Sequence, residues 1–245
     1  MGEGIRHVGG GQSDYEARML YRLRRVAMNR VLKRLALPSP PRVFELGSGC
    51  GFWAGFLAEK GVREYVGSDL SPTAVARLSS AFPQYKFWSM DAAASGWDHI
   101  RQQAPYDLGL AIDVLYHIVD DAAWDLNLGE LCRVTRHAVI LVDYFYEQPR
   151  EPSSHVKHRS AQMYVDVLAR HDFRVAWIQP VFHLHNRIIG GPWADQNRVF
   201  SRCLRVARSS RAGLWCLTAL DLLATKLARP MSPLCKARML AATRG

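Results

Sequence analysis

The chain has 245 residues, of which 49% are hydrophobic and 22% charged, and this balance excludes a disordered or fibrous protein. Its five cysteines form no C-x-x-C pair, which excludes a zinc ribbon or a disulfide scaffold and predicts a reducing, cytoplasmic location. The net charge of +10 is unevenly divided: residues 1–40 carry +5, residues 41–195 carry −4 and residues 196–245 carry +9. No uncharged apolar run is long enough to cross a bilayer.

The first predicted element is a helix over residues 13–37, which Pro38 ends. Short apolar runs typical of strands then alternate with helical stretches. The predicted strands are 42–46, 64–69, 85–90, 106–113, 138–144 and 173–181, and the predicted helices are 52–60, 72–81, 121–135 and 160–171. Such alternation indicates a mostly parallel sheet with helices on both faces.

The tail has a different pattern. Residues 197–211 predict a basic helix and residues 213–228 a strongly apolar one, while residues 236–243 predict a last strand. That strand is antiparallel if it returns to the sheet edge beside its predecessor. We therefore expect a basic N-terminal helix (1–40), a cofactor-binding Rossmann-like core (41–182), and a helical cap insertion with the final strand (183–245), giving an α/β fold with a seven-stranded sheet.

The strongest local signal is a glycine-rich turn between the first strand and its helix. Gly47, Gly49 and Gly51 permit backbone angles that other residues resist, and the helix start adds unpaired N–H groups. Asp69 ends the next strand, 22 residues after Gly47, which is about the spacing at which an acidic residue meets a ribose diol. Asp91 ends the third strand run, so three polar features follow one sheet edge.

Four ordered motifs together resemble the class I S-adenosylmethionine-dependent methyltransferases: ELGSGCG (45–51), GSDLS (67–71), Met90-Asp91-Ala92 and YDLGLAIDVLYHI (106–118). The resemblance spans residue 42 to about 178. It implies S-adenosylmethionine as cofactor, with its methionyl end among Glu45, Gly47, Gly49 and Gly51. It further implies that Asp69 and its neighbour Leu70 lie at the ribose, Asp91 and Ala92 at the adenine, and Asp113 at the floor of the site.

The competing interpretation is a nicotinamide-dependent oxidoreductase. Its fingerprint is G-x-G-x-x-G/A, whereas this chain has G-x-G-x-G followed by Phe52. Glu45 would also repel a pyrophosphate, while it would attract the ammonium group of a sulfonium cofactor. These two departures favour the methyltransferase.

Methyl transfer to a hydroxyl group needs alignment and a proton acceptor. His117, after the fourth strand, is our candidate base, and a packing role is its alternative. Tyr116, His155, His158 and Arg159 are the candidate acceptor-binding residues; a solvated helix start is the alternative for the last three. We predict no metal, because nothing supplies a third ligand to the pair His183 and His185.

The motif DVLYHIVDD with the later HVKHR also resembles methyltransferases of sugar, glycan and natural-product pathways. We therefore expect O-methylation of a small molecule, such as a sugar or polyketide-like compound, with a hydrophobic or lipid-linked acceptor as a variant. The alternatives are an RNA methyltransferase, which would use the arginines after residue 196, and a non-catalytic cofactor-binding protein. The sequence argues against nucleic acid because no aromatic residues interleave those arginines as base-stacking platforms. It leaves peripheral membrane contact through the C-terminal helices and a homodimer open.

Overall fold

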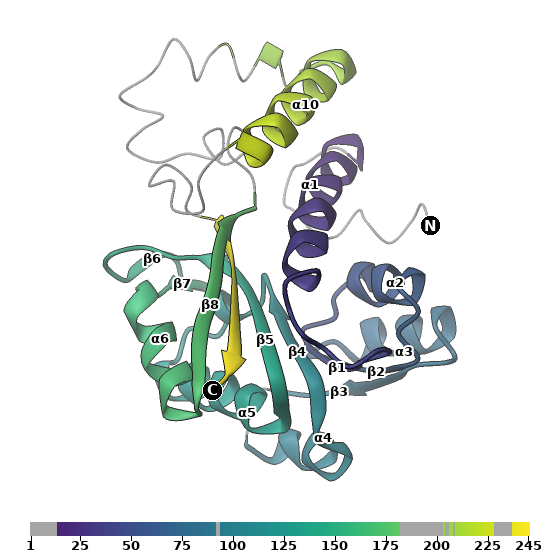
Figure 1. The fold of residues 1–245 in the computed structure, drawn as a ribbon, viewed down its shortest axis with the longest axis vertical. Helices are drawn as coiled ribbons and strands as arrows, with labels where there is room; N and C mark the ends of the chain where they lie inside the picture. Colours follow the sequence, from purple (N-terminus) through teal and green to yellow (C-terminus); the bar gives the residue numbers. More distant parts are fainter. Residues whose placement is uncertain (1–13, 92–93, 182–202, 204–205, 208, 228–236) are drawn as a thin grey trace. The chain divides into compact units, whose positions relative to one another are not determined.

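The computed structural model describes residues 14–91, 94–181, 203, 206–207, 209–227 and 237–245 (Figure 1). These residues fall into two compact units. One lies within Met1–Val31 and Ile178–Met239, and the other within Leu32–Trp177 and Leu240–Gly245. The chain's first helix thus groups with the segment before the last strand, a pairing that the sequence did not indicate.

A seven-stranded sheet has the order β3-β2-β1-β4-β5-β9-β8. Strand β1 pairs in parallel with β2 and β4, β2 with β3, and β4 with β5. The strands are β1 (Arg42–Leu46), β2 (Glu64–Asp69), β3 (Lys86–Ser89), β4 (Tyr106–Ile112), β5 (Thr135–Tyr144), β8 (Phe173–Pro180) and β9 (Ala237–Arg244). The predicted seven-stranded, mostly parallel, Rossmann-like fold is confirmed.

The last strand, β9, runs antiparallel to β8 (Figure 1, yellow and green). The N–H of Gly245 donates to the carbonyl of Asp172 (3.0 Å), and the N–H of Val181 donates to that of Ala237 (3.1 Å). Both the existence of this strand and its expected direction agree with the sequence. Its position differs in one respect: β9 lies between β5 and β8, so the edge strand is β8.

Helices connect the parallel strands. They are α2 (Phe52–Glu59), α3 (Pro72–Ala81), α4 (Asp98–Gln103), α5 (Asp121–Val134) and α6 (Ala161–Arg170), with two short 3-10 helices, η2 (Ala94–Trp97) and η3 (Leu115–His117). Side chains cap three of them: Ser71 accepts from the N–H of Ala74 and Asp120 from that of Ala123, while Ser160 caps α6. These caps fix where each helix starts after its strand or loop.

A hairpin follows β5 that the sequence did not predict. Strands β6 (Arg150–Ser153) and β7 (Val156–His158) pair antiparallel, and every residue of β6 is exposed. The hairpin contacts η3, so two loops that are distant in sequence lie together beyond the carboxyl ends of β4 and β5. Acceptor sites of α/β proteins gather at this edge of the sheet.

The unit formed by Met1–Val31 and Ile178–Met239 contains α10 (Arg211–Leu227) and all of α1 (Asp14–Leu32) except its last residue. Helix α1 buries a stripe of residues at helical spacing that includes Leu23, Ala27 and Val31, but it ends five residues before the predicted position. Helix α10 confirms the predicted apolar helix. The predicted basic helix over residues 197–211 lies almost entirely outside the described residues, as do His183 and His185. Among the described helices, none is both long and apolar enough to cross a membrane.

Candidate functional site

The glycine-rich turn joins β1 to α2 through left-handed backbone. Gly47, Gly49 and Gly51 have φ values of 78°, 53° and 78°. A side chain at Gly47 would also place its Cβ 2.6 Å from Cγ2 of Val114. Only glycine meets both conditions at this position, so the turn keeps its backbone open to a ligand.

Asp69, at the end of β2, fixes the turn. Its Oδ2 accepts a hydrogen bond from the N–H of Gly49 (2.8 Å), and its Oδ1 accepts one from the N–H of Ser71 (3.0 Å). Each carboxylate oxygen has about two lone-pair sites, so both can accept a further hydrogen bond. A carboxylate held rigidly in this way suits a pair of ligand hydroxyl groups.

A cavity of about 260 Å³ lies at this edge of the sheet. Its lining residues come from the ends of β1, β2, β3 and β4 and from α5: Leu46, Gly47, Ser68, Asp69, Leu70, Met90, Asp91, Val114, His117, Ile118 and Asn127. Five of our predicted site residues line it, namely Gly47, Asp69, Leu70, Asp91 and His117. Leu70 is 72% exposed beside it, an unusual position for a leucine and one that a bound apolar group would cover.

The charge of this lining separates two ligand classes. Among the described residues, this lining holds two carboxylates, Asp69 and Asp91, and neither lysine nor arginine. A pyrophosphate in this cavity would lie against two carboxylates, whereas hydroxyl and amino groups would find hydrogen-bond acceptors there. The lining therefore fits a nucleoside with a cationic side chain better than a dinucleotide.

Glu45 lies beneath the turn, fully buried in β1. The Tyr65 hydroxyl donates to its Oε2, while Oε1 has no hydrogen bond. Burial raises the pKa of Glu45 from 4.5 to about 8, with the charge of Asp69 adding to the rise and the bond from Tyr65 opposing it. Glu45 does not line the cavity, and its predicted contact with the cofactor stays a prediction.

His117 ends η3 and is exposed at the cavity wall. Its Nδ1 lies 3.2 Å from the carbonyl oxygen of His155, which can only accept a hydrogen bond. We therefore assign the proton of the neutral ring to Nδ1, which leaves Nε2 with a lone pair. That tautomer is the one a general base needs.

Arg159 differs from our expectation. Its side chain is fully buried, with the guanidinium bonded to Asp121 (Nε–Oδ1, 3.0 Å) and to the carbonyls of Val119 and Asp120 (3.2 Å each). It also lies 4.7 Å above the Trp124 ring. These hydrogen bonds link the hairpin to the start of α5. Because the guanidinium is buried and already hydrogen-bonded, it is not available to an acceptor carboxylate or phosphate. We correct its predicted role from acceptor binding to structure.

The other predicted residues are placed as follows. Asp113 follows β4 with a positive φ of 55°, and its N–H donates to the Val142 carbonyl (3.0 Å). Tyr116 and His158 lie in ring contact beside the cavity wall, and His155 is exposed in the hairpin turn. Ala92 lies outside the described residues. Among the described residues no three His, Cys, Asp or Glu side chains could together hold a metal ion.

Besides Leu46 and Ser68, sequence reasoning missed four lining residues with apolar or amide side chains. They are Met90, Val114, Ile118 and Asn127. The first three fall within motifs that we quoted. Their closeness in sequence to Asp91 and His117 could have indicated that they line the site. Asn127 had none, because it reaches the cavity from the middle of α5.

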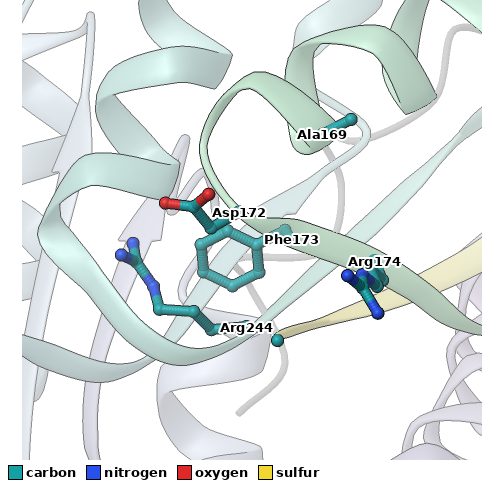
Figure 2. A pocket seen from close by; sticks show the side chains of 6 residues that line it. Ala169, Asp172, Phe173, Arg174 and Arg244 are labelled. Carbon is teal, nitrogen blue, oxygen red and sulfur yellow. The ribbon is translucent and has the colours of Figure 1, made fainter.

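A larger cavity, of about 490 Å³, lies where β8 begins and β9 ends (Figure 2). Asp172, Phe173, Arg174 and Arg244 line it, and Arg244 is bonded to the carbonyls of Cys132 and Thr135. No predicted site residue lines this cavity. The larger volume therefore does not make it our candidate site, because the predicted site residues line the smaller cavity.

The comparisons with known proteins concern the domain family and the fold. Residues 43–138 match a family described as "Methyltransferase domain". A search of curated proteins finds no match.

Solved structures of several methyltransferases are similar in fold. Magnesium protoporphyrin IX methyltransferase from Synechocystis, with bound SAM, has a TM-score of 0.57 and 17% identity over 98% of this chain and 88% of that one. An O-methyltransferase from a Brevibacillus brevis trans-AT PKS multienzyme, in complex with S-adenosyl-L-homocysteine, has a TM-score of 0.56 and 14% identity. The match covers 94% of this chain and 73% of that one. A Burkholderia thailandensis 1,6-didemethyltoxoflavin-N1-methyltransferase has a TM-score of 0.54 and 12% identity. The match covers 92% of this chain and 78% of that one.

The sheet order, the glycine turn and the family match together define the class of protein. Residues 43–138 of this chain match a methyltransferase domain, and the sheet around them has the Rossmann-like methyltransferase fold. The family and the enzyme class predicted from the sequence are confirmed.

Proposed function

We propose that the protein transfers a methyl group from S-adenosylmethionine to a hydroxyl group of a small molecule. The observation that carries this proposal is the acidic cavity beside the glycine turn, with Asp69 held by two backbone N–H groups. Asp69 would bind the ribose hydroxyls, Asp91 the adenine amino group, and the glycine turn the methionyl end. The bound cofactor supplies a methyl group on a positively charged sulfur.

The residues of the chain then have three tasks. Leu70, Met90 and Ile118 supply apolar surface that excludes water from the cofactor. Val114 and the turn fix the floor on which the acceptor and the methyl group align, and alignment alone contributes about 7–11 kcal/mol to catalysis. His117 would accept the hydroxyl proton at Nε2, because its Nδ1 is directed at the His155 carbonyl.

Binding of the cofactor is the first test. Calorimetric titration of S-adenosylmethionine and S-adenosylhomocysteine should give micromolar affinity for both, and a nicotinamide dinucleotide should not bind. Asp69→Asn should weaken both complexes at least tenfold, because hydrogen bonds to a charged group contribute about 1.5–3 kcal/mol each. The control is Asp166→Asn, which neutralises an exposed carboxylate on α6. Equal affinity in both variants would refute the site.

A further inference from the structure

Six aromatic side chains with polar atoms gather beside the cofactor cavity. We call them the aromatic wall: Tyr116, His117, Tyr144, Tyr146, His155 and His158. The Tyr116 ring lies 4.4 Å from that of His117, 5.4 Å from His158 and 5.9 Å from Tyr144, between ring centroids. The six residues come from η3, from the end of β5 and from the β6–β7 hairpin. Only one of them, His117, lines the cofactor cavity itself, so the wall extends that cavity toward the hairpin.

His158 is the centre of the wall. Its ring lies 5.1 Å from Tyr144 and 5.3 Å from Tyr146, and only 9% of the residue is exposed. Its Nδ1 is buried without a hydrogen bond and lies 3.9 Å from Oδ1 of Asp143. A buried polar atom that lacks a partner is costly, and at a candidate site it indicates that a bound group or water completes the arrangement.

Asp143 is itself held firmly. The Tyr164 hydroxyl donates to its Oδ2, and the N–H of Tyr144 donates to its Oδ1 (2.6 Å). The carboxylate is 1% exposed. The wall therefore has one firmly held carboxylate at its buried side, 3.9 Å from His158 Nδ1.

The charged groups around the wall are already engaged. Lys157 pairs with Asp121 (2.9 Å) and Glu151 (3.2 Å). Arg150 lies 4.9 Å above the Tyr146 ring, and Arg159 is buried in its own bonds. An acceptor bearing a phosphate or carboxylate would have to displace one of these contacts, whereas an uncharged acceptor would not.

We propose that the aromatic wall is the acceptor subsite and that it takes an uncharged, planar aromatic molecule carrying a hydroxyl group. This inference rests on the proposed function and narrows its acceptor class. Rings pair favourably with offset or edge-to-face neighbours at centroid separations of about 4.5–7 Å. The ring pairs of the wall lie between 4.4 Å (Tyr116 and His117) and 6.4 Å (His117 and His155). A few oriented polar groups in an aromatic lining set the direction of such a ligand. A sugar, which exposes hydroxyl groups on all sides, would need more partners than these rings supply.

The test compares naphthol with decahydronaphthol, its saturated counterpart, by calorimetry on the full chain loaded with S-adenosylhomocysteine. We expect naphthol to bind at least tenfold more tightly. Tyr144→Leu, which keeps apolar volume but removes a ring, should lower the naphthol affinity at least tenfold and change the affinity for S-adenosylhomocysteine less than twofold. The matched control is Trp88→Leu, which removes a half-buried ring of β3 outside the wall and should change neither affinity.

The outcomes separate the two proposals. If S-adenosylhomocysteine binds but the two probes bind equally, or neither binds, the acceptor class is wrong while the proposed function stands. Unchanged naphthol affinity in Tyr144→Leu would also overturn the subsite. Failure of S-adenosylhomocysteine to bind the folded chain would refute the proposed function and the subsite with it.

Discussion

Replacing Glu45 with Gln should change how the stability of the protein depends on pH. The folded-state pKa of Glu45 is about 8, and the ordinary value is 4.5. Below pH 4.5 both the folded and the unfolded chain hold this proton. Between pH 4.5 and 8 only the folded chain keeps it, so stability falls as the pH rises. The difference of about 3.5 pKa units, at 1.36 kcal/mol each, amounts to about 5 kcal/mol.

Glu45→Gln has no titrating group at this position, so the pH dependence of stability that Glu45 causes is lost. A Gln carbonyl can still accept the bond from the Tyr65 hydroxyl, so the local packing is kept. Urea unfolding of both proteins without ligand, from pH 5 to pH 9, gives the free energy of unfolding at each pH. We expect the variant minus wild-type difference to rise by about 4 kcal/mol from pH 5 to pH 9, because about 1 kcal/mol of the total is already present at pH 5, and to level off above pH 8. The control replaces Glu147, an exposed glutamate, with Gln. A difference that stays flat with pH would refute the burial argument.

Three further predictions concern the described residues. Gly47→Ala should lower the free energy of unfolding by about 3 kcal/mol, because the positive φ and the close approach of Val114 both oppose a side chain. Gly49→Ala should lower it by only about 1 kcal/mol, because Gly49 shares the positive φ but has open space around it. Equal losses in urea unfolding would contradict the clash. Arg159→Met should lower the free energy of unfolding by about 2 kcal/mol, because two buried carbonyls lose a charged donor. It should leave the naphthol affinity unchanged, and weaker naphthol binding would show that Arg159 does contact the acceptor. Asp120→Ala should lower the midpoint temperature of thermal unfolding, because loss of the α5 cap costs about 1 kcal/mol of stability. An unchanged midpoint would show that this cap does not stabilise the protein.

The strands of the sheet could be predicted because their apolar runs are short and clearly bounded. All seven residues of β4 are buried, as a central strand of a parallel sheet covered on both faces requires. The hairpin could not be predicted in the same way. Its residues are mostly exposed and polar, and it is tied in place by Lys157 and Arg159 through Asp121, which lies 36 and 38 residues earlier. Contacts at such separation leave no periodic signal in the sequence.

The site shows the same division between local and distant information. Backbone conformations at the glycine turn follow from residue type, so Gly47 and Asp69 were found together. The environments of Glu45 and Arg159 depend on neighbours far along the chain, Tyr65 and Trp124 among them. A charged residue in a motif can therefore serve a ligand or be buried beneath one, and residue spacing does not distinguish the two.

The position of β9 sets the order in which the sheet can be assembled. Strands β5 and β8 are both made before β9, yet β9 lies between them, so neither can complete its pairing until residues 237–244 have been synthesised. Until then each has an unpaired edge, which is an opportunity for pairing with another chain. The other four strands, β1 to β4, need no such wait. We therefore expect the nascent protein to depend most on chaperone protection during the synthesis of the segment between β8 and β9.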